Sequence, residues 1–218
     1  MDQNEISGDL IIPDRSTNIL VFAHGSGSTG TSYRNQALAH ALNNNGFSTL
    51  LFDLLTEAEK QIDRKVENMS VKIPGMTLNK FNIKLLTQRL ISITEWVQNS
   101  NETKNLDIGY LGASTGAAAA LYAAARFHDI KVLVFRSGRV DLIDKQILPC
   151  IVCPCLFIVG GNDKKVIDIN KNTMTQLKNA KNKKIEIIEG ASHLFEEQGK
   201  LQQVVYLSLS WCKTFFAR

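Results

Sequence analysis

The chain has 218 residues, of which 44% are hydrophobic, so it can bury one sizeable core but is too short for two comfortable domains. Lys and Arg outnumber Asp and Glu by 25 to 21, a formal charge of +4, and the basic residues form no dense stripe with interleaved aromatics. That pattern argues against nucleic acid as a partner. We therefore predict a single domain over residues 1–218.

The amino-terminal residues and the cysteines indicate the compartment. MDQNEISGDLIIP is polar and acidic, without the basic and apolar regions of a secretory signal, and no apolar run is long enough to span a membrane. Cys150, Cys153 and Cys155 crowd into PCIVCPC, but a second pair or a nearby histidine is missing. We interpret them as reduced thiols rather than metal ligands, and expect a cytoplasmic protein that needs neither a metal nor an organic cofactor.

Short apolar runs rich in Ile, Val, Leu and Phe alternate along the chain with longer segments of helical period. This alternation is typical of the α/β class, with a mainly parallel sheet flanked by helices on both faces. The predicted strands cover residues 18–24, 47–55, 106–113, 131–137, 155–161 and 184–190, with 8–12 as a candidate antiparallel edge. The predicted helices cover residues 32–46, 77–100, 115–128, 166–180 and 202–218. We expect residues 56–76, which are polar and interrupted by Pro74 and Gly75, to form a surface loop or short helix.

Residues 112–116, GASTG, join a predicted strand to an alanine-rich helix. In that setting the G-x-S-x-G pattern predicts a nucleophile elbow. The sharp turn projects the Ser114 hydroxyl from the carboxyl edge of the sheet, and the glycines let the helix pack close behind it. The alternative is a plain strand-to-helix turn in which Ser114 has no chemical role.

A serine hydroxyl is a weak nucleophile, so it needs a base to take its proton and an acid to orient that base. Asp163 follows the predicted strand 155–161, and His193 follows the next one, so parallel strands would bring both to the edge that carries Ser114. Two alternatives stay open. Asp163 could cap the following helix, with Asp141 or Asp168 as the acid instead, and His193 could be an ordinary loop histidine.

The stretch AHGSGSTG, residues 23–30, leaves the first strong strand and supplies a glycine-rich loop where acyl transfer needs oxyanion donors. We assign the oxyanion hole to the backbone N–H groups of Ser26 and Thr115, with Gly25 or Gly27 as substitutes. His24 is expected to shape the loop. A phosphate loop is the rival interpretation, but the Gly-Lys-Ser/Thr ending is missing.

Together, HGSGS, GASTG, VGGND and GASHLF resemble the α/β-hydrolase superfamily, and within it the dienelactone hydrolase-like branch of small enzymes without a lid. The resemblance covers the chain from about residue 18 onward. It implies a sheet of about eight strands or a close variant, no cap domain, and a triad of Ser114, Asp163 and His193. Dienelactone hydrolases proper carry cysteine where this chain has Ser114, so serine favours ordinary ester hydrolysis. The chain also resembles stand-alone hydrolases whose relatives are fused to phosphoribosyltransferase-like domains, and we see no such domain in these residues.

Two arginines in FRSGRVD follow the predicted strand 131–137 and should lie near the catalytic edge. A guanidinium there could hold a carboxylate or phosphate of the substrate. The interpretation we favour is that Arg136 and Arg139 pair with Asp141 or Asp144 and fix the loop.

Other parts of the pocket follow from expected position alone. Leu194 and Phe195, beside the candidate base, are expected to form an apolar wall, and the 56–76 segment and the loop around Tyr33 and Arg34 to border the pocket. We predict a serine hydrolase of small ester substrates that works through an acyl-enzyme, as a monomer or homodimer. The alternatives are a thioesterase or acyltransferase using the same site, or a non-catalytic binding protein with the hydrolase fold.

Overall fold

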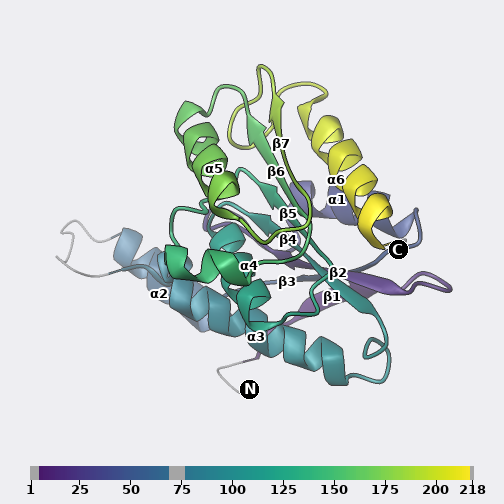
Figure 1. Cartoon of the computed structure of the whole chain (residues 1–218). Helices are drawn as coiled ribbons and strands as arrows, with labels where there is room; N and C mark the ends of the chain where they lie inside the picture. The colour runs from purple at the N-terminus through teal and green to yellow at the C-terminus, as the bar shows by residue number, and fades with distance from the viewer. Residues whose placement is uncertain (1–4, 69–76, 217–218) are drawn as a thin grey trace.

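The computed structural model describes residues 5–68 and 77–216, and its central feature is a sheet of seven strands in the order β1-β3-β2-β4-β5-β6-β7 (Figure 1). The strands are β1 (Gly8–Ile11), β2 (Asn18–Ala23), β3 (Ser48–Phe52), β4 (Asp107–Ala113), β5 (Val132–Arg136), β6 (Cys155–Gly160) and β7 (Lys183–Ile188). Only β1 runs antiparallel to its neighbour; every other adjacent pair of these strands is parallel. The predicted α/β class and all seven predicted strands are confirmed, and the sheet is a close variant of the one that the resemblance implies.

Six α-helices surround this sheet in the described residues. They are α1 (Tyr33–Asn43), α2 (Glu57–Glu67), α3 (Ile83–Asn99), α4 (Thr115–Arg126), α5 (Lys164–Gln176) and α6 (Lys200–Phe216). Figure 1 shows α1 and α6 on one face and α3, α4 and α5 on the other. All five predicted helices are confirmed. None of the helices within residues 5–68 and 77–216 combines the length and the apolar character needed to span a bilayer.

The central strands are apolar on both faces because both faces are covered. In β2, Ile19 and Val21 pack into the core beneath α3 and α4, whereas Leu20 and Phe22 pack into the core beneath α1 and α6. All four side chains are at most 2% exposed. Burial on both sides explains why these strands read as continuous apolar runs rather than as an alternation of apolar and polar residues.

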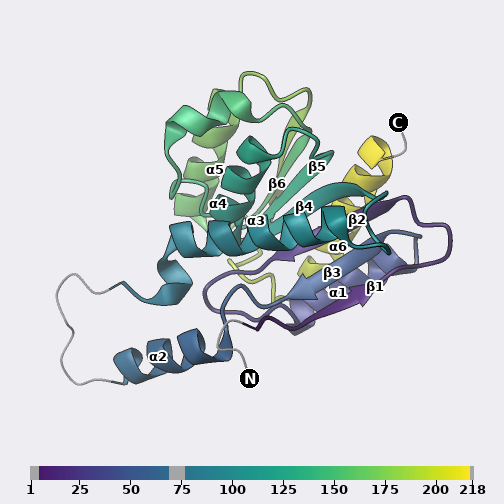
Figure 2. The same ribbon diagram turned by 90° about the horizontal axis from the view of Figure 1, so that it is seen from below.

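The expected surface segment at 56–76 begins with a helix, α2, and residues 69–76 lie outside the described part of the chain. Thr56 and Glu59 form a capping box, in which each side chain accepts the other residue's backbone N–H. Arg89 of α3 forms an ion pair with Glu59 at 2.8 Å, and the buried Asp63 accepts two backbone N–H groups of the 3-10 helix η1 (Asn79–Phe81). Figure 2 shows α2 at the periphery of the molecule, where these contacts link it to η1 and to Arg89 of α3.

Between β5 and β6 the chain forms one short 3-10 helix, η2 (Lys145–Cys150). The prediction of a fold without a cap domain is therefore confirmed. Since β2, β4, β5, β6 and β7 are parallel, the loops that follow them meet at one edge of the sheet, and the candidate site is built there.

Candidate active site

Ser114 lies between β4 and α4 with φ 48° and ψ −119°, a conformation that non-glycine residues rarely adopt. Three backbone hydrogen bonds hold it there. Its N–H donates to the carbonyl of Arg136 at 3.1 Å, and its own carbonyl accepts N–H groups from Ala117 at 3.1 Å and Arg139 at 2.9 Å. The strained turn is thus anchored to β5, to the first turn of α4 and to the loop after β5, which is the setting of a nucleophile elbow.

Close packing explains why the second glycine of the GASTG motif, Gly116, cannot be replaced by a residue with a Cβ. A Cβ built on Gly116 would lie 2.1 Å from the carbonyl oxygen of Ala23 and 2.6 Å from that of His24. Only glycine lets α4 begin this close to the end of β2. The same approach brings the loop after β2 against the Ser114 turn.

His193 and Asp163 come from neighbouring loops, after β7 and β6, and their side chains meet. The distance from His193 Nδ1 to Asp163 Oδ2 is 2.5 Å. A carboxylate accepts the proton on Nδ1, which leaves Nε2 as the nitrogen free to act as a base. The histidine side chain is 37% exposed and the aspartate 18% exposed, so the pair is reachable from solvent at its histidine end.

The three candidate acids differ in their contacts. Asp163 occupies the position before α5, but its side chain makes no capping hydrogen bond. Asp141 is held by Arg139 through two hydrogen bonds of 2.8 and 2.9 Å, which keep the pKa of Asp141 below its ordinary value despite partial burial. Asp168 is exposed on α5. Of the three candidates, only Asp163 contacts His193.

The loop that carries His193 is fixed on both sides. Ser137 Oγ donates to the carbonyl of His193 at 2.9 Å, and the N–H of Ser192 donates to Glu197 Oε1 at 2.8 Å. A Cβ built on Gly160 would lie 2.3 Å from the carbonyl oxygen of Ser192, so the loop packs directly on the end of β6. These contacts set the position of the histidine relative to Asp163.

Ser114 and His193 line the same two cavities, of about 500 Å³ and about 250 Å³. The larger one also contains Asp163, and the smaller one contains the loop after β2. The hydroxyl of Ser114 makes no hydrogen bond with any residue that the structure describes. Hydrogen bonds between nucleophile and base are often long in the absence of substrate and tighten when substrate binds.

The two proposed oxyanion donors, the backbone N–H groups of Ser26 and Thr115, make no hydrogen bond within residues 5–68 and 77–216. The loop with Ser26 is fixed by His24, whose Nδ1–H donates to the Gly25 carbonyl and whose Nε2 accepts the Leu54 N–H, both at 2.9 Å. Burial lowers the pKa of His24, so the ring is neutral and shapes the loop as predicted.

Comparison with known proteins agrees with this architecture. Residues 6–211 match the Dienelactone hydrolase family. This chain belongs to the dienelactone hydrolase family. It is 41% identical to a dienelactone hydrolase from Anabaena variabilis, whose crystal structure superposes with a TM-score of 0.87 over 96% of this chain and 92% of that one.

Two further relatives are informative in different ways. The chain is 41% identical over 94% of its length to a Mycobacterium tuberculosis protein named "Putative phosphoribosyl transferase", but it spans only 43% of that protein. Est1E from Butyrivibrio proteoclasticus is 16% identical, with a TM-score of 0.76 over 98% of this chain and 95% of that one. At that identity Est1E supports the α/β-hydrolase fold alone.

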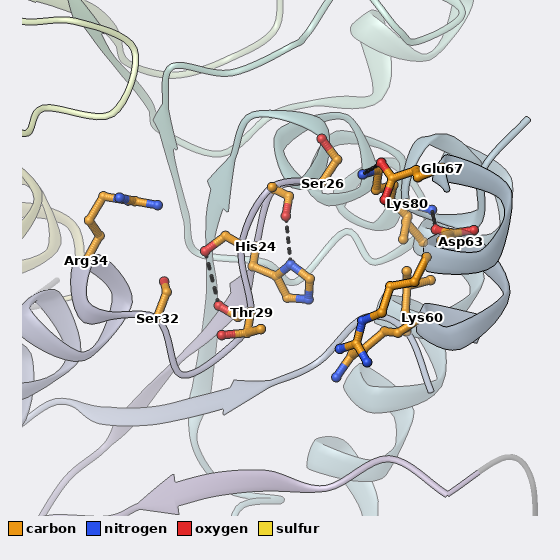
Figure 3. A pocket seen from close by; sticks show the side chains of 15 residues that line it. His24, Ser26, Thr29, Ser32, Arg34, Lys60, Asp63, Glu67 and Lys80 are labelled. Atoms are coloured by element: carbon orange, nitrogen blue, oxygen red, sulfur yellow. Dashed lines mark hydrogen bonds and ion pairs between the residues drawn. The ribbon is translucent and has the colours of Figure 1, made fainter. Parts of the chain in front are cut away.

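In this member of the dienelactone hydrolase family, a third cavity of about 470 Å³ adjoins the smaller of the two cavities at Ser114 and shares the loop after β2 with it. Figure 3 shows that side chains from α2 and η1 face this loop across the cavity, with Arg34 at the start of α1; the labelled residues are His24, Ser26, Thr29, Ser32, Arg34, Lys60, Asp63, Glu67 and Lys80. Residues of the 56–68 segment line this adjoining cavity and not the two that contain Ser114, whereas Arg34 also borders the smaller cavity at Ser114, as predicted. Tyr33 is 73% exposed and does not line it.

Asp53 is a residue of this region that the sequence analysis missed. Its carboxylate accepts the Gly30 N–H at 2.6 Å and the Lys60 ammonium at 2.5 Å, which ties the loop after β2 to α2. Burial raises the pKa of Asp53, but these two hydrogen bonds outweigh burial and hold the pKa below its ordinary value. The predicted strand 47–55 ran through Asp53, whereas β3 ends at Phe52, so the position of Asp53 directly after a strand could not be recognised from the sequence.

The two arginines after β5 differ. Arg139 pairs with Asp141, as the favoured interpretation predicted. For Arg136 that interpretation is wrong: Nη2 donates to Asn35 Oδ1 at 2.9 Å, and Nη1 is buried with no hydrogen-bond partner among the described residues. Asp144, the other acid considered, instead accepts the Gln146 N–H beside η2.

The two hydrophobic residues after His193, Leu194 and Phe195, lie in different environments. Leu194 lines the 250 Å³ cavity, as expected of an apolar wall. Phe195 adopts φ 58° and is 1% exposed in the core beneath α6, so its assignment to that wall is wrong. Within residues 5–68 and 77–216, no group of three or more His, Cys, Asp or Glu side chains is placed to hold a metal ion.

Proposed function

We propose that this protein is a carboxylic ester hydrolase that acts on small esters through Ser114, His193 and Asp163. The observation that carries the proposal is the contact of 2.5 Å between His193 and Asp163, at the sheet edge where Ser114 is held in a strained turn. A histidine that is oriented by a carboxylate and shares a cavity with a partly buried serine is the arrangement that activates a hydroxyl. The backbone N–H groups of Ser26 and Thr115, which make no hydrogen bond within the described part of the chain, support it.

The reaction follows from these positions. Ser114 Oγ attacks the ester carbonyl while His193 Nε2 takes the hydroxyl proton, and Asp163 stabilises the imidazolium through Nδ1–H. The negative charge on the carbonyl oxygen is stabilised by the N–H groups of Ser26 and Thr115. His193 then gives its proton to the departing alcohol, which leaves an acyl group on Ser114. A water molecule, deprotonated by His193, releases the acid and restores the serine.

The two relatives that are 41% identical to this chain support the proposal to different degrees, because the chain covers different shares of them. The Anabaena variabilis dienelactone hydrolase matches this chain over nearly the full length of both proteins, so its hydrolytic class is a reasonable guide. The phosphoribosyl transferase name belongs to a protein more than twice as long as the matched region. We therefore assign ester hydrolysis, and not phosphoribosyl transfer, to the site around Ser114.

Hydrolysis of p-nitrophenyl acetate, butyrate and octanoate by the purified protein tests the proposal, with Ser114→Ala as the decisive variant. Removal of a triad nucleophile lowers kcat by several orders of magnitude, so we expect a loss of at least about a thousandfold. Ser92→Ala, an exposed serine on α3, is the matched control and should keep wild-type activity. Ser114-dependent labelling by a fluorophosphonate probe gives a second reading that does not depend on the choice of ester. Equal activity in wild type and Ser114→Ala, or labelling that survives the substitution, would contradict the triad.

A further inference from the structure

The third cavity, of about 470 Å³, lies between the loop after β2 and α2 and has no part in the reaction proposed above (Figure 3). Four consecutive loop residues, 25–28, line both this cavity and the smaller cavity at Ser114. The loop begins against the serine, because a Cβ built on Gly25 would lie 2.9 Å from Ser114 Cβ. A Cβ built on Gly27 would meet no described atom within 4 Å. A group that follows the loop away from Ser114 can therefore pass over Gly27 into the third cavity.

The charged side chains that line the third cavity are already paired. The ion pairs are Arg34–Glu196, Lys60–Asp53, Arg64–Glu57 and Lys80–Glu67. The remaining carboxylate, Asp63, accepts the backbone N–H groups of Asn79 and Lys80 at 2.8 and 2.9 Å. Since each charge that the structure describes here has a partner, the cavity does not call for a counter-ion from the substrate.

The loop contributes hydroxyl groups to the same cavity. The side chains of Ser26 and Thr29 make no hydrogen bond within residues 5–68 and 77–216, and Ser32 Oγ is buried without a partner there. A hydroxyl both donates and accepts, and a paired ammonium or carboxylate keeps further donor or acceptor sites. Leu55 and Leu86, which are largely buried, add apolar surface. The cavity thus combines many hydrogen-bonding groups with a small apolar surface.

This lining favours a neutral, hydroxylated group over an alkyl chain or an anion. An alkyl chain would take the hydroxyls and ion pairs out of water without replacing their hydrogen bonds, which is unfavourable. An anion would lie near the carboxylates of Asp63 and Glu67. A hydroxylated chain can bond to the serine and threonine hydroxyls while its carbon atoms pack on the two leucines.

The part of the substrate that reaches the third cavity follows from the proposed function. The leaving alcohol must receive its proton from His193, and so lies toward the 500 Å³ cavity, which also contains Asp163. The carbonyl oxygen points at the loop after β2, which lines the smaller cavity. The acyl part of the substrate is therefore the part that extends along this loop.

We propose that the third cavity binds a neutral, hydroxylated end of the acyl group. The preferred substrates are then esters of acids that carry hydroxyl groups remote from the carbonyl. This inference rests on the proposed function of the same site. Ser26 and Thr29, whose hydroxyls lack partners among the described residues, are the side chains expected to contact the substrate hydroxyls.

The first test uses the methyl esters of 6-hydroxyhexanoic, 8-hydroxyoctanoic and 10-hydroxydecanoic acids in a pH-stat assay. Each is compared with the ester in which a methyl group replaces the terminal hydroxyl. We expect the ratio of the two kcat/KM values to be highest at the length that reaches the cavity. At that length it should fall about three- to tenfold in Ser26→Ala/Thr29→Val, which removes both hydroxyls and keeps the backbone N–H of residue 26. Ser92→Ala/Thr214→Val, at exposed positions of α3 and α6, is the matched control and should leave the ratio unchanged.

The second test closes the route between the two cavities. The Gly27→Leu side chain would enter the open space over the loop without meeting a described atom at its Cβ, and Gly27 does not have a positive φ. The kcat/KM of the preferred hydroxylated ester should fall about tenfold or more relative to that of methyl acetate. Equal losses for the long and the short ester would mean that the acyl group does not pass over Gly27, and would overturn the proposal.

The outcomes separate this inference from the proposed function. If the esters are hydrolysed but the ratio is the same in wild type and Ser26→Ala/Thr29→Val at all three lengths, the cavity proposal is overturned and the esterase stands. If the wild-type protein hydrolyses no ester, the proposed function fails, and binding of the three hydroxylated acids as their amides decides the cavity separately. Saturation-transfer NMR should then show contact with the hydroxymethyl protons in wild type that is lost in Gly27→Leu. Contact that is missing in wild type, or that persists in Gly27→Leu, overturns the proposal.

Discussion

The backbone strain at Ser114 can be measured as stability. With φ 48° and ψ −119°, the serine occupies a region that favours glycine, so Ser114→Gly should relieve strain that Ser114→Ala retains. Its hydroxyl has no hydrogen bond with the described residues, so the alanine variant should be about as stable as the wild type. We therefore predict that the inactive glycine variant is the most stable of the three proteins.

The size of the effect follows from two opposing terms. A non-glycine residue in such a conformation costs roughly 1–3 kcal/mol, and glycine returns roughly 0.5–1 kcal/mol of that through the extra freedom of the unfolded chain. The net gain of Ser114→Gly over Ser114→Ala is then about 1 kcal/mol in the free energy of unfolding. For a chain of this length, that corresponds to a rise in Tm of about 2–4 °C.

Chemical denaturation of the two variants measures this difference, and Ser32 supplies the control. Ser114 and Ser32 both precede a helix, where glycine is preferred over alanine in any case, but Ser32 has an ordinary φ of −60° and its side chain makes no capping hydrogen bond. The glycine-over-alanine difference at Ser114 should exceed that at Ser32 by about 1 kcal/mol. Equal differences at the two positions would show that the Ser114 turn is not strained.

Three further predictions test other parts of the site. Gly160→Ala would place a methyl group 2.3 Å from the Ser192 carbonyl, so it should displace the His193 loop, destabilise the protein by about 1–3 kcal/mol in urea denaturation and lower kcat at least tenfold. Asp163→Asn should lower kcat by about three to four orders of magnitude in the ester assay, because the amide cannot stabilise the imidazolium. Because burial lowers the pKa of His24, the unfolded chain binds a proton below its ordinary value of 6.5 that the folded protein does not. Stability should therefore fall as pH drops from 7 to 5, by up to about 1.4 kcal/mol per pH unit, and this dependence should be flatter in His24→Gln.

Each of these has a clear contrary result. Gly160→Ala with wild-type kcat would mean that the His193 loop is not set by the end of β6. Asp163→Asn with unchanged kcat would return the role of acid to another residue. An identical pH dependence of stability in wild type and His24→Gln would show that His24 takes up a proton in the folded state.

The sheet was predictable because its strands are buried on both faces, which leaves unbroken apolar runs in the sequence. The helix α2 was left open as a loop or short helix because its residues are polar and only Asp63 among them is buried. Its local signal was nevertheless present: Thr56 followed three residues later by Glu59 is the pattern of a capping box.

The proposed triad could be assembled from the sequence because parallel strands bring residues that are far apart in the chain to the same edge of the sheet. Residues after consecutive parallel strands reach the same edge of the sheet whatever their separation, so Ser114, Asp163 and His193 needed only the strand boundaries. Orientation within a loop follows no such rule. Phe195 is only two residues from His193, the proposed base, yet its positive φ turns the side chain into the core rather than into the pocket.

The two arginines after β5 show which contacts can be predicted from the sequence and which cannot. Arg139 and its partner Asp141 are two residues apart, so proximity in the sequence was enough to predict the pair. Arg136 contacts Asn35, which is 101 residues away on α1, and no periodicity or spacing relates the two. The loops at the sheet edge are placed by the strand topology, whereas the surroundings of Arg136, whose guanidinium has only Asn35 as a hydrogen-bond partner within the described residues, depend on contacts between segments far apart in the sequence. The sequence can therefore indicate a hydrolase, but the long-range contacts that bear on its choice of ester become known only from the structure.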